Sequence, residues 1–229
     1  MSPLEAILDG LEARYGEIAS PTPDDPYELV IFLNCGYPAS DERCAKGFDA
    51  LKTEVGLGPA AILAADDTAL ASVMQSAGGM IPEMRAVRLK QIAATVQDRH
   101  GGDLRAALMA APALAKALLG RFPTLGDPAA ERILLFCGLA PEAAAPASCL
   151  HVLVRLGLCA EGKDFPATYR AARAAIASGV PEDFAARQRA YLLLKAHGHG
   201  LCRRSSPRCE PCPVNAGCGY FQSASAAAG

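Results

Sequence analysis

Four cysteines near the C-terminus constrain this chain more than any other feature of its sequence. Cys202, Cys209, Cys212 and Cys218 form the pattern C-x6-C-x2-C-x5-C, and they are four of the nine cysteines in 229 residues. Thiolates are the usual ligands of iron–sulfur clusters and also bind zinc. Zinc sites typically present two close cysteine pairs, whereas this pattern has a single one. We therefore expect the loop to enclose one compact cuboidal cluster, with zinc or four buried structural thiols as the alternatives.

The composition limits where such a protein works. No apolar run approaches the roughly 20 residues needed to cross a bilayer, and the first residues are acidic and amphipathic, unlike a signal peptide. We therefore expect a cytoplasmic protein without a membrane partner, in a compartment where disulfides are not expected. The formal net charge is −2, so any nucleic-acid site must come from local positive charge.

Hydrophobic periodicity predicts an all-α fold, because apolar residues recur at helical spacing and strand alternation is hard to find. Residues 20–26 are rich in residues that interrupt helices, which predicts a linker. Gly101 and Asp103 are predicted to be a helix C-cap and the N-cap of the next helix. The predicted helices cover residues 1–18, 27–34, 41–55, 58–65, 67–76, 82–99, 103–109, 111–120, 128–137, 148–157, 166–178 and 182–196. The low-complexity end, residues 222–229, is predicted to be a disordered tail.

Residues 119–133 predict two helices joined by a tight turn. Gly126 can take a positive φ, Asp127 suits the N-cap position, and Pro128 suits the first helical position. A turn that opens a helix exposes backbone N–H groups and a partial positive charge, which together can hold a phosphate. We therefore treat Thr124, Leu125 and Gly126 as candidate DNA contacts; the alternative is a plain helical hairpin.

Together, the cysteine loop and the hairpin resemble the endonuclease III / MutY branch of the helix-hairpin-helix (HhH-GPD) DNA glycosylases. The cysteine spacing matches that family's [4Fe–4S] motif, and residues 197–202 resemble the segment that leads to the first cysteine of that motif. Residues 122–126 resemble its L-P-G-V-G hairpin, with Thr124 in place of the first Gly. The resemblance extends from about residue 4 to residue 221.

The resemblance implies a fold of two α-helical lobes. A six-helix lobe that carries the hairpin would span residues 23–136, and residues 1–22 would join residues 137–221 in a cluster lobe. It also implies a [4Fe–4S] cluster on the four cysteines. Double-stranded DNA, damaged or distorted, would lie across the cleft, bound by a monomer that acts in base-excision repair on the nucleoid.

The sequence departs from the family at both catalytic positions. The lysine of the bifunctional members falls on Pro128, whose nitrogen is an amide without a nucleophilic lone pair. The aspartate that assists departure of the base falls at about Pro146. Two carboxylates are candidate substitutes: Asp127, whose simpler role is an N-cap, and Glu142, whose simpler role is a solvated loop side chain.

Other residues can still hold DNA. Arg203, Arg204 and Arg208 lie between the first two cysteines and can contact phosphates; the alternative is that they balance the anionic thiolates. Tyr37 can stack on bases or pack in its turn. The leading hypothesis is an iron–sulfur DNA-binding protein without the usual glycosylase or AP-lyase chemistry. The alternatives are an atypical monofunctional glycosylase with a relocated acid and a redox-sensing iron–sulfur protein.

Overall fold

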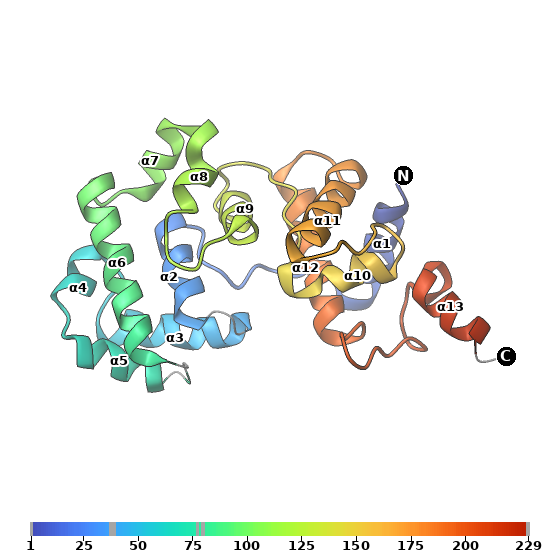
Figure 1. Ribbon diagram of the computed structural model, residues 1–229, viewed down its shortest axis with the longest axis horizontal. Coiled ribbons are helices and arrows are strands. Elements are labelled where there is room, and N and C mark those ends of the chain that lie inside the picture. Colours follow the sequence, from blue (N-terminus) through green and yellow to red (C-terminus); the bar gives the residue numbers. More distant parts are fainter. Residues whose placement is uncertain (1, 37–39, 77, 79–80, 228–229) are drawn as a thin grey trace. The chain divides into compact units, whose positions relative to one another are not determined.

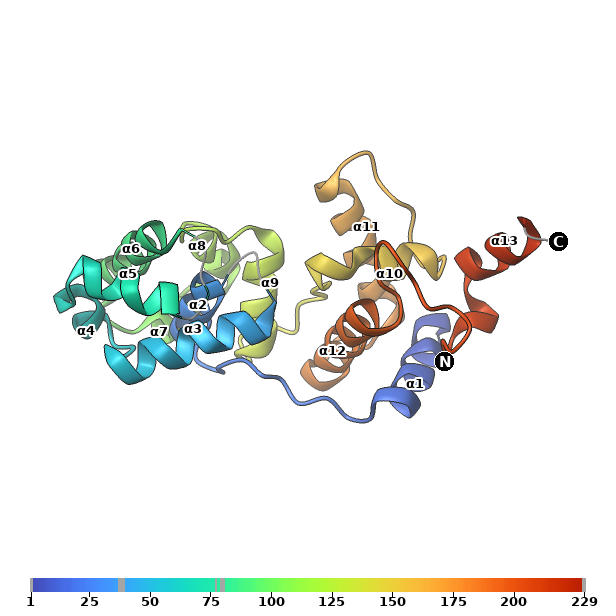
Figure 2. The same ribbon diagram turned by 90° about the horizontal axis from the view of Figure 1, so that it is seen from below.

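The computed structural model describes residues 2–36, 40–76, 78 and 81–227, and every regular element in this part of the chain is helical (Figures 1 and 2). The predicted all-α class is therefore confirmed. The chain forms two compact units. We call residues 21–139 the hairpin unit, and residues 1–20 together with residues 140–229 the cysteine unit.

The hairpin unit is built around α2, which is buried on every face. Leu29, Val30, Ile31 and Phe32 are consecutive and at most 1% exposed, so the helix is hydrophobic all round. Asp25 caps its start by accepting hydrogen bonds from the Tyr27 and Glu28 N–H groups. The helices of this unit are α2 (Pro26–Gly36), α3 (Asp41–Glu54), α4 (Pro59–Ala64), α5 (Asp67–Ser76), α6 (Pro82–His100), α7 (Leu104–Ala110), α8 (Ala115–Leu119) and α9 (Asp127–Phe136), with a 3₁₀ turn η1 (Pro112–Leu114) before α8.

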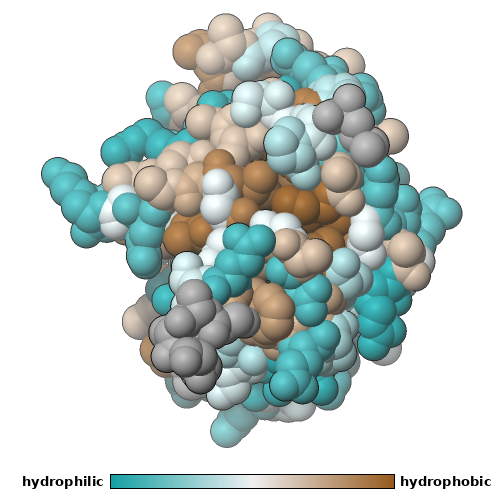
Figure 3. Space-filling model, turned by 90° about the vertical axis from the view of Figure 1, so that its right-hand side faces the viewer, coloured by the Kyte–Doolittle hydropathy of each residue, from teal (hydrophilic) through white to brown (hydrophobic). Residues whose placement is uncertain are grey.

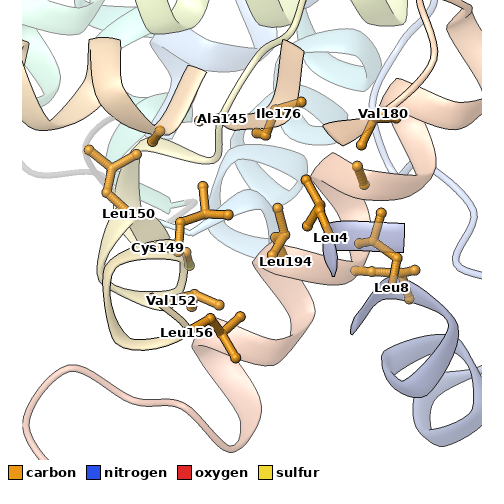
Figure 4. Packing of buried hydrophobic residues seen from close by; sticks show 14 of the residues in the cluster. Leu4, Leu8, Ala145, Cys149, Leu150, Val152, Leu156, Ile176, Val180 and Leu194 are labelled. Carbon is orange, nitrogen blue, oxygen red and sulfur yellow. The ribbon is translucent and has the colours of Figure 1, made fainter. Parts of the chain in front are cut away.

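The cysteine unit combines the first helix with the C-terminal ones. Figure 4 shows Leu4 and Leu8 of α1 in one hydrophobic cluster with Val152, Ile176 and Leu194. These side chains are all at most 2% exposed, so α1 completes this core from more than a hundred residues away in the sequence. The helices are α1 (Pro3–Tyr15), α10 (Leu150–Arg155), α11 (Phe165–Gly179), α12 (Phe184–Gly200) and α13 (Gly219–Ala227), with 3₁₀ turns η2 (Ala147–Cys149) and η3 (Asn215–Gly217).

Two expectations about helix ends can be compared directly with the structure. Gly101 takes a left-handed conformation (φ 60°) at the C-cap of α6, and Asp103 caps α7 through the Ala106 N–H, as predicted. At the C-terminus, α13 runs to Ala227 through most of the segment predicted as a disordered tail. Alanine has the highest helix propensity, which favours continuation of a helix in that segment. No helix among the described residues is long and apolar enough to cross a membrane.

We expect Leu8→Ala to destabilise the cysteine unit by about 3 kcal/mol, because it leaves a cavity in a core that α1 completes. Four of the six tyrosines (Tyr15, Tyr169, Tyr191 and Tyr220) belong to this unit, so urea unfolding followed by tyrosine fluorescence reports on it. The matched control is Leu114→Ala, at a leucine that is 62% exposed, and it should change stability by less than about 0.5 kcal/mol. Equal unfolding midpoints for the two variants would contradict the assignment of α1 to this core.

Candidate functional site

The turn between α8 and α9 is anchored by hydrophobic side chains. Phe122 and Leu125 are 3% and 5% exposed, and the Leu125 N–H donates to the Phe122 carbonyl, so the predicted contact at Leu125 is buried within the hairpin unit. The left-handed residue of the turn is Thr124, with a φ of +64°. The expectation for Gly126 is wrong, because Gly126 has a φ of −89°, is extended, and serves as the N-cap of α9.

A positive φ is unusual for a β-branched residue, and a buried asparagine holds this one in place. The Thr124 Oγ1 donates to Asn34 Oδ1 at 3.0 Å, and Asn34 Nδ2 donates to the carbonyls of Val30 (3.0 Å) and Pro123 (3.4 Å). Arg85 Nη1 donates to the Asn34 carbonyl at 2.9 Å. Asn34 and Arg85 are 2% and 5% exposed, so the network is shielded from water. Sequence reasoning missed it because no local pattern pairs Asn34 with a residue 90 positions away.

The turn presents unpaired backbone donors. The Gly126 carbonyl accepts from the Ala129 and Ala130 N–H groups and so starts α9. The N–H groups of Thr124 and Gly126 have no acceptor within the described part of the chain. Gly126 is exposed, so its N–H lies at the surface beside the N-terminus of a ten-residue helix. Amide donors next to a positive helix end are the geometry that binds phosphate.

One lysine beside the turn pairs with two carboxylates. Asp127 is the first residue of α9 rather than its N-cap, because the extended Gly126 takes the cap position. Its side chain is 73% exposed and lies 3.4 Å from Lys116 Nζ. Lys116 also donates to the buried Glu131 at 2.5 Å. Burial is the largest single effect and lowers the pKa of Lys116, but the hydrogen bonds to Glu131 and Asp127 and the charges of these two carboxylates together outweigh it, so the pKa is raised and the lysine stays charged. Lys116 is therefore shared between two carboxylates and offsets the negative charge of Asp127 only in part.

The two catalytic positions implied by the family resemblance hold prolines in different units. Pro128 lies in the first turn of α9, and Pro146 precedes the 3₁₀ turn η2. The stretch before Pro146 is apolar, with residues 143–145 at most 2% exposed. Glu142, the nearest carboxylate along the chain, pairs with Arg173 at 2.7 Å. This ion pair and a hydrogen bond from Arg187 to the Pro141 carbonyl tie the loop to α11 and α12.

The four cysteines of the loop line one small pocket of about 20 Å³, together with Arg155 and His197. Among the described residues, no three His, Cys, Asp or Glu side chains are close enough to share a single metal ion. A tetrahedral ion brings all its ligands to about 2.0–2.3 Å from one point. A cuboidal cluster instead binds each thiolate at a separate iron and holds the sulfurs farther apart. The structure therefore brings the four cysteines of the motif to one pocket, and a four-thiol donor set suits an iron–sulfur cluster.

Arg155 organises this loop. Its Nη1 donates to the Arg203 carbonyl and its Nη2 to the Arg204 carbonyl, both at 2.7 Å. Nη1 also lies 3.6 Å from Cys202 Sγ, and the Cys218 thiol donates to the Arg155 carbonyl at 3.3 Å. One residue of α10 thus holds both the first and the last cysteine. Its guanidinium group also supplies positive charge beside a sulfur that must be deprotonated to bind a metal.

His197 supports the pocket from α12. Its Nδ1 lies 3.1 Å from the Tyr15 hydroxyl and its Nε2 lies 3.7 Å from Cys212 Sγ. Burial lowers the pKa of His197 to about 4, and the neighbouring His151 adds to this effect, so the ring is neutral at neutral pH. Burial raises the pKa values of the Cys202 and Cys212 thiols. When Tyr15 donates to Nδ1, the Nε2–H of a neutral ring can donate to the Cys212 sulfur.

The basic residues between the first two cysteines are accessible. The side chains of Arg203, Arg204 and Arg208 are all exposed. Arg203 Nε and Arg208 Nη2 donate to the Gly200 carbonyl at 3.2 and 3.3 Å, so both side chains are oriented by the end of α12. Tyr37 lies outside the described residues, so its stacking role stays a prediction.

Comparisons with known proteins identify the fold. A trapped endonuclease III–DNA covalent intermediate (an estranged-adenine complex) matches with a TM-score of 0.78 and 17% identity, over 97% of each chain. A non-covalent endonuclease III–DNA complex matches with the same score and identity, over 99% of this chain and 100% of that one. A thermostable thymine-DNA glycosylase has a TM-score of 0.73 and 20% identity, over 96% of this chain and 95% of that one. No protein-family model and no curated protein matches the sequence. The chain therefore has the endonuclease III fold, and the resemblance drawn from its motifs is confirmed at that level.

We expect Thr124→Gly to be more stable than Thr124→Ala by about 1 kcal/mol, because both lose the hydroxyl but only glycine adopts a φ of +64° without strain. Urea unfolding of the two variants measures the difference. The matched control is the exposed helical position Ala69, where Ala69→Gly should cost about 1 kcal/mol. A Thr124→Ala variant as stable as Thr124→Gly would contradict the left-handed assignment.

Proposed function

We propose that this chain is a monomeric iron–sulfur, helix-hairpin-helix protein that binds double-stranded DNA, damaged or distorted, without the standard glycosylase or AP-lyase reaction. The observation that carries the proposal is the α8–α9 turn. It presents backbone donors in a chain with the endonuclease III fold, and Pro128 follows it where the family has its lysine. The fold alone would not establish a function, so the proposal rests on the site.

The hairpin would bind one phosphate through the Thr124 and Gly126 N–H groups. The Asn34 network fixes the turn before DNA arrives, so little conformational entropy is lost on binding. Contacts of this kind position a protein on the duplex without reading its sequence. This explains how a chain of net charge −2 can bind a polyanion.

The cysteine loop would supply the second contact. Cys202, Cys209, Cys212 and Cys218 would hold a [4Fe–4S] cluster, which cross-links the loop and can exchange electrons when bound. Arg155 and His197 would orient the loop and donate to cysteine sulfurs. Arg203, Arg204 and Arg208 would then face phosphates as fixed positive charges.

Neither catalytic position can support the standard reaction. Pro128 has no amine to attack C1′, and Pro146 has no carboxylate to assist departure of the base. The two substitutes are already engaged in ion pairs, Asp127 with Lys116 and Glu142 with Arg173. An atypical monofunctional glycosylase remains the alternative, in which one of these carboxylates leaves its partner and acts as the acid.

We expect anaerobically purified protein to be brown and to contain about four iron atoms per chain. Cys209→Ser should lose most of the iron and the visible absorbance, because the loop then lacks one of its four thiolates. Cys159→Ser is the matched control, at a half-buried cysteine that does not line the pocket, and it should keep both. Iron-free protein that holds one zinc ion would contradict the cluster assignment.

The function is tested with end-labelled duplexes that carry oxidised, deaminated, alkylated or abasic sites. We expect salt-dependent binding and no alkali-labile breaks. Arg208→Ala should reduce the slope of log K against log salt by about 1, because one phosphate contact is lost. Arg170→Ala, an exposed arginine of α11 outside the loop, should leave the slope unchanged.

Each other outcome identifies an alternative. Breaks at one lesion that Asp127→Asn or Glu142→Gln abolishes would show the atypical glycosylase. If the protein holds an intact cluster but binds no duplex at any salt concentration, the remaining hypothesis is a redox-sensing iron–sulfur protein. A borohydride-trapped covalent adduct would overturn the loss of amine chemistry.

A further inference from the structure

A groove of about 550 Å³ in the cysteine unit lies beside the cysteine loop, with Arg155 and Arg204 in its lining. Leu150 and Val154 of α10 give it an apolar part, and its other residues come from α10, the segment before α11, the start of α11, the cysteine loop and α13. The volume falls within the range of about 300–1,000 Å³ that is typical of small-molecule sites. On the α13 side of the molecule, hydrophobic residues gather in a band between hydrophilic ones (Figure 3).

The groove carries free positive charge. Lys163 and Arg204 line it, both are exposed, and no carboxylate pairs with either of them among the described residues. Arg155 and His151 line it as well, although the Arg155 guanidinium is already bonded to two loop carbonyls. An anionic group is therefore the expected partner of Lys163 and Arg204.

Two carboxylates share the groove and limit its net charge. Glu161 and Asp164 both line it and are exposed. Asp164 is committed to capping α11, where its Oδ1 accepts from the Ala167 N–H at 2.8 Å and complements the positive helix end. Asp164 keeps its negative charge in the cap, so the lining carries three positive charges, on Arg155, Lys163 and Arg204, against two negative ones, and its net charge is +1.

Two exposed aromatic rings also face the groove. Phe165 is 50% exposed and stacks on the buried Tyr169, with ring centroids 6.1 Å apart and an interplanar angle of 21°. Tyr220 is 42% exposed and lies 4.8 Å from the Arg155 guanidinium. Because Tyr169 stacks on Phe165 and half of Phe165 is exposed, Phe165 offers aromatic surface on which another flat ring can stack. Aromatic side chains beside cations are the combination that binds single-stranded nucleotides.

The wall that carries Lys163 and Phe165 is rigid. The Gly162 N–H donates to Thr168 Oγ1, which in turn donates to the Asp164 carbonyl, both at 3.0 Å. A Cβ on Gly162 would lie 2.5 Å from Ala167 Cβ and 2.7 Å from the Thr168 nitrogen, so this turn packs directly on α11. The backbone that carries Lys163 and Phe165 is therefore fixed before any ligand binds.

We propose that this groove binds a nucleoside phosphate, with its base on Phe165 and its phosphate between Lys163 and Arg204. The ligand is either a free nucleotide or a nucleotide of an unpaired DNA strand, since both offer a flat base and a phosphate. The site shares Arg204 with the duplex contact proposed for the cysteine loop, whereas Lys163 and Phe165 belong to the groove alone, so variants of these two residues test the groove separately from duplex binding.

The test is isothermal titration of dAMP, inorganic phosphate and deoxyadenosine into the full-length holoprotein. dAMP should bind, Phe165→Ala should weaken it about tenfold, and Phe165→Tyr should restore it because the ring is kept. Lys163→Gln should also weaken dAMP binding. The matched controls are Leu114→Ala and Lys52→Gln, at exposed residues of the hairpin unit, and neither should have an effect.

Anisotropy of labelled d(A)8 and of an intact duplex separates the two sources of nucleotide. If d(A)8 binds more tightly than dAMP, and Phe165→Ala removes this binding but leaves duplex binding unchanged, the groove binds an unpaired strand. Equal binding of the two probes would assign it to free nucleotide. Unchanged dAMP affinity in Phe165→Ala, or phosphate binding as tightly as dAMP, would overturn the proposal. Failure of duplex binding alone would overturn only the function proposed above.

Discussion

Hydrogen bonds from side chains to main-chain carbonyls are the interaction on which both candidate sites depend. A loop has no intrahelical partners for its backbone polar groups, so side chains must supply them where the loop meets the core. In the hairpin unit Asn34 bonds to the Pro123 carbonyl, and in the cysteine unit Arg155 bonds to the Arg203 and Arg204 carbonyls. Each side chain belongs to a helix that is fixed by hydrophobic packing, and this rigidity is passed to the loop that carries the proposed contacts.

The parts of the fold that sequence predicts are those with local causes. Helical periodicity places nearly all the helices, and the Gly101 and Asp103 caps follow from the chemistry of those two residues. The turn after α8 shows the limit of such reasoning. Glycine is the usual residue at a positive φ, yet Thr124 takes it because the Asn34 side chain compensates with a hydrogen bond from α2. The residue that offsets the strain at Thr124 lies far away in the sequence, so no local sequence pattern predicts the positive φ.

The candidate site was predictable in its residue types and less so in its electrostatics. The sequence identifies the four cysteines and the three loop arginines as candidates. In the structure the cysteines line one pocket and the arginines are exposed to solvent. The sequence does not reveal that Asp127 pairs with Lys116 or Glu142 with Arg173, because these partners lie on other segments. Ion pairs between separate segments depend on tertiary packing, and no spacing rule along the chain reports them.

Binding and reaction place different demands on this fold, and the proposed function follows from that difference. Holding a phosphate needs donors at fixed positions, which the Thr124 and Gly126 backbone can supply whatever side chain follows them. The lyase reaction of the bifunctional glycosylases needs one specific amine, and departure of the base is assisted by one specific carboxylate whose loss slows the reaction by about 10²–10⁴-fold. Pro128 suits the first turn of a helix, where its missing N–H costs nothing. Proline at that position therefore keeps the helix that supports the hairpin while it removes the nucleophile, so loss of reaction need not weaken binding.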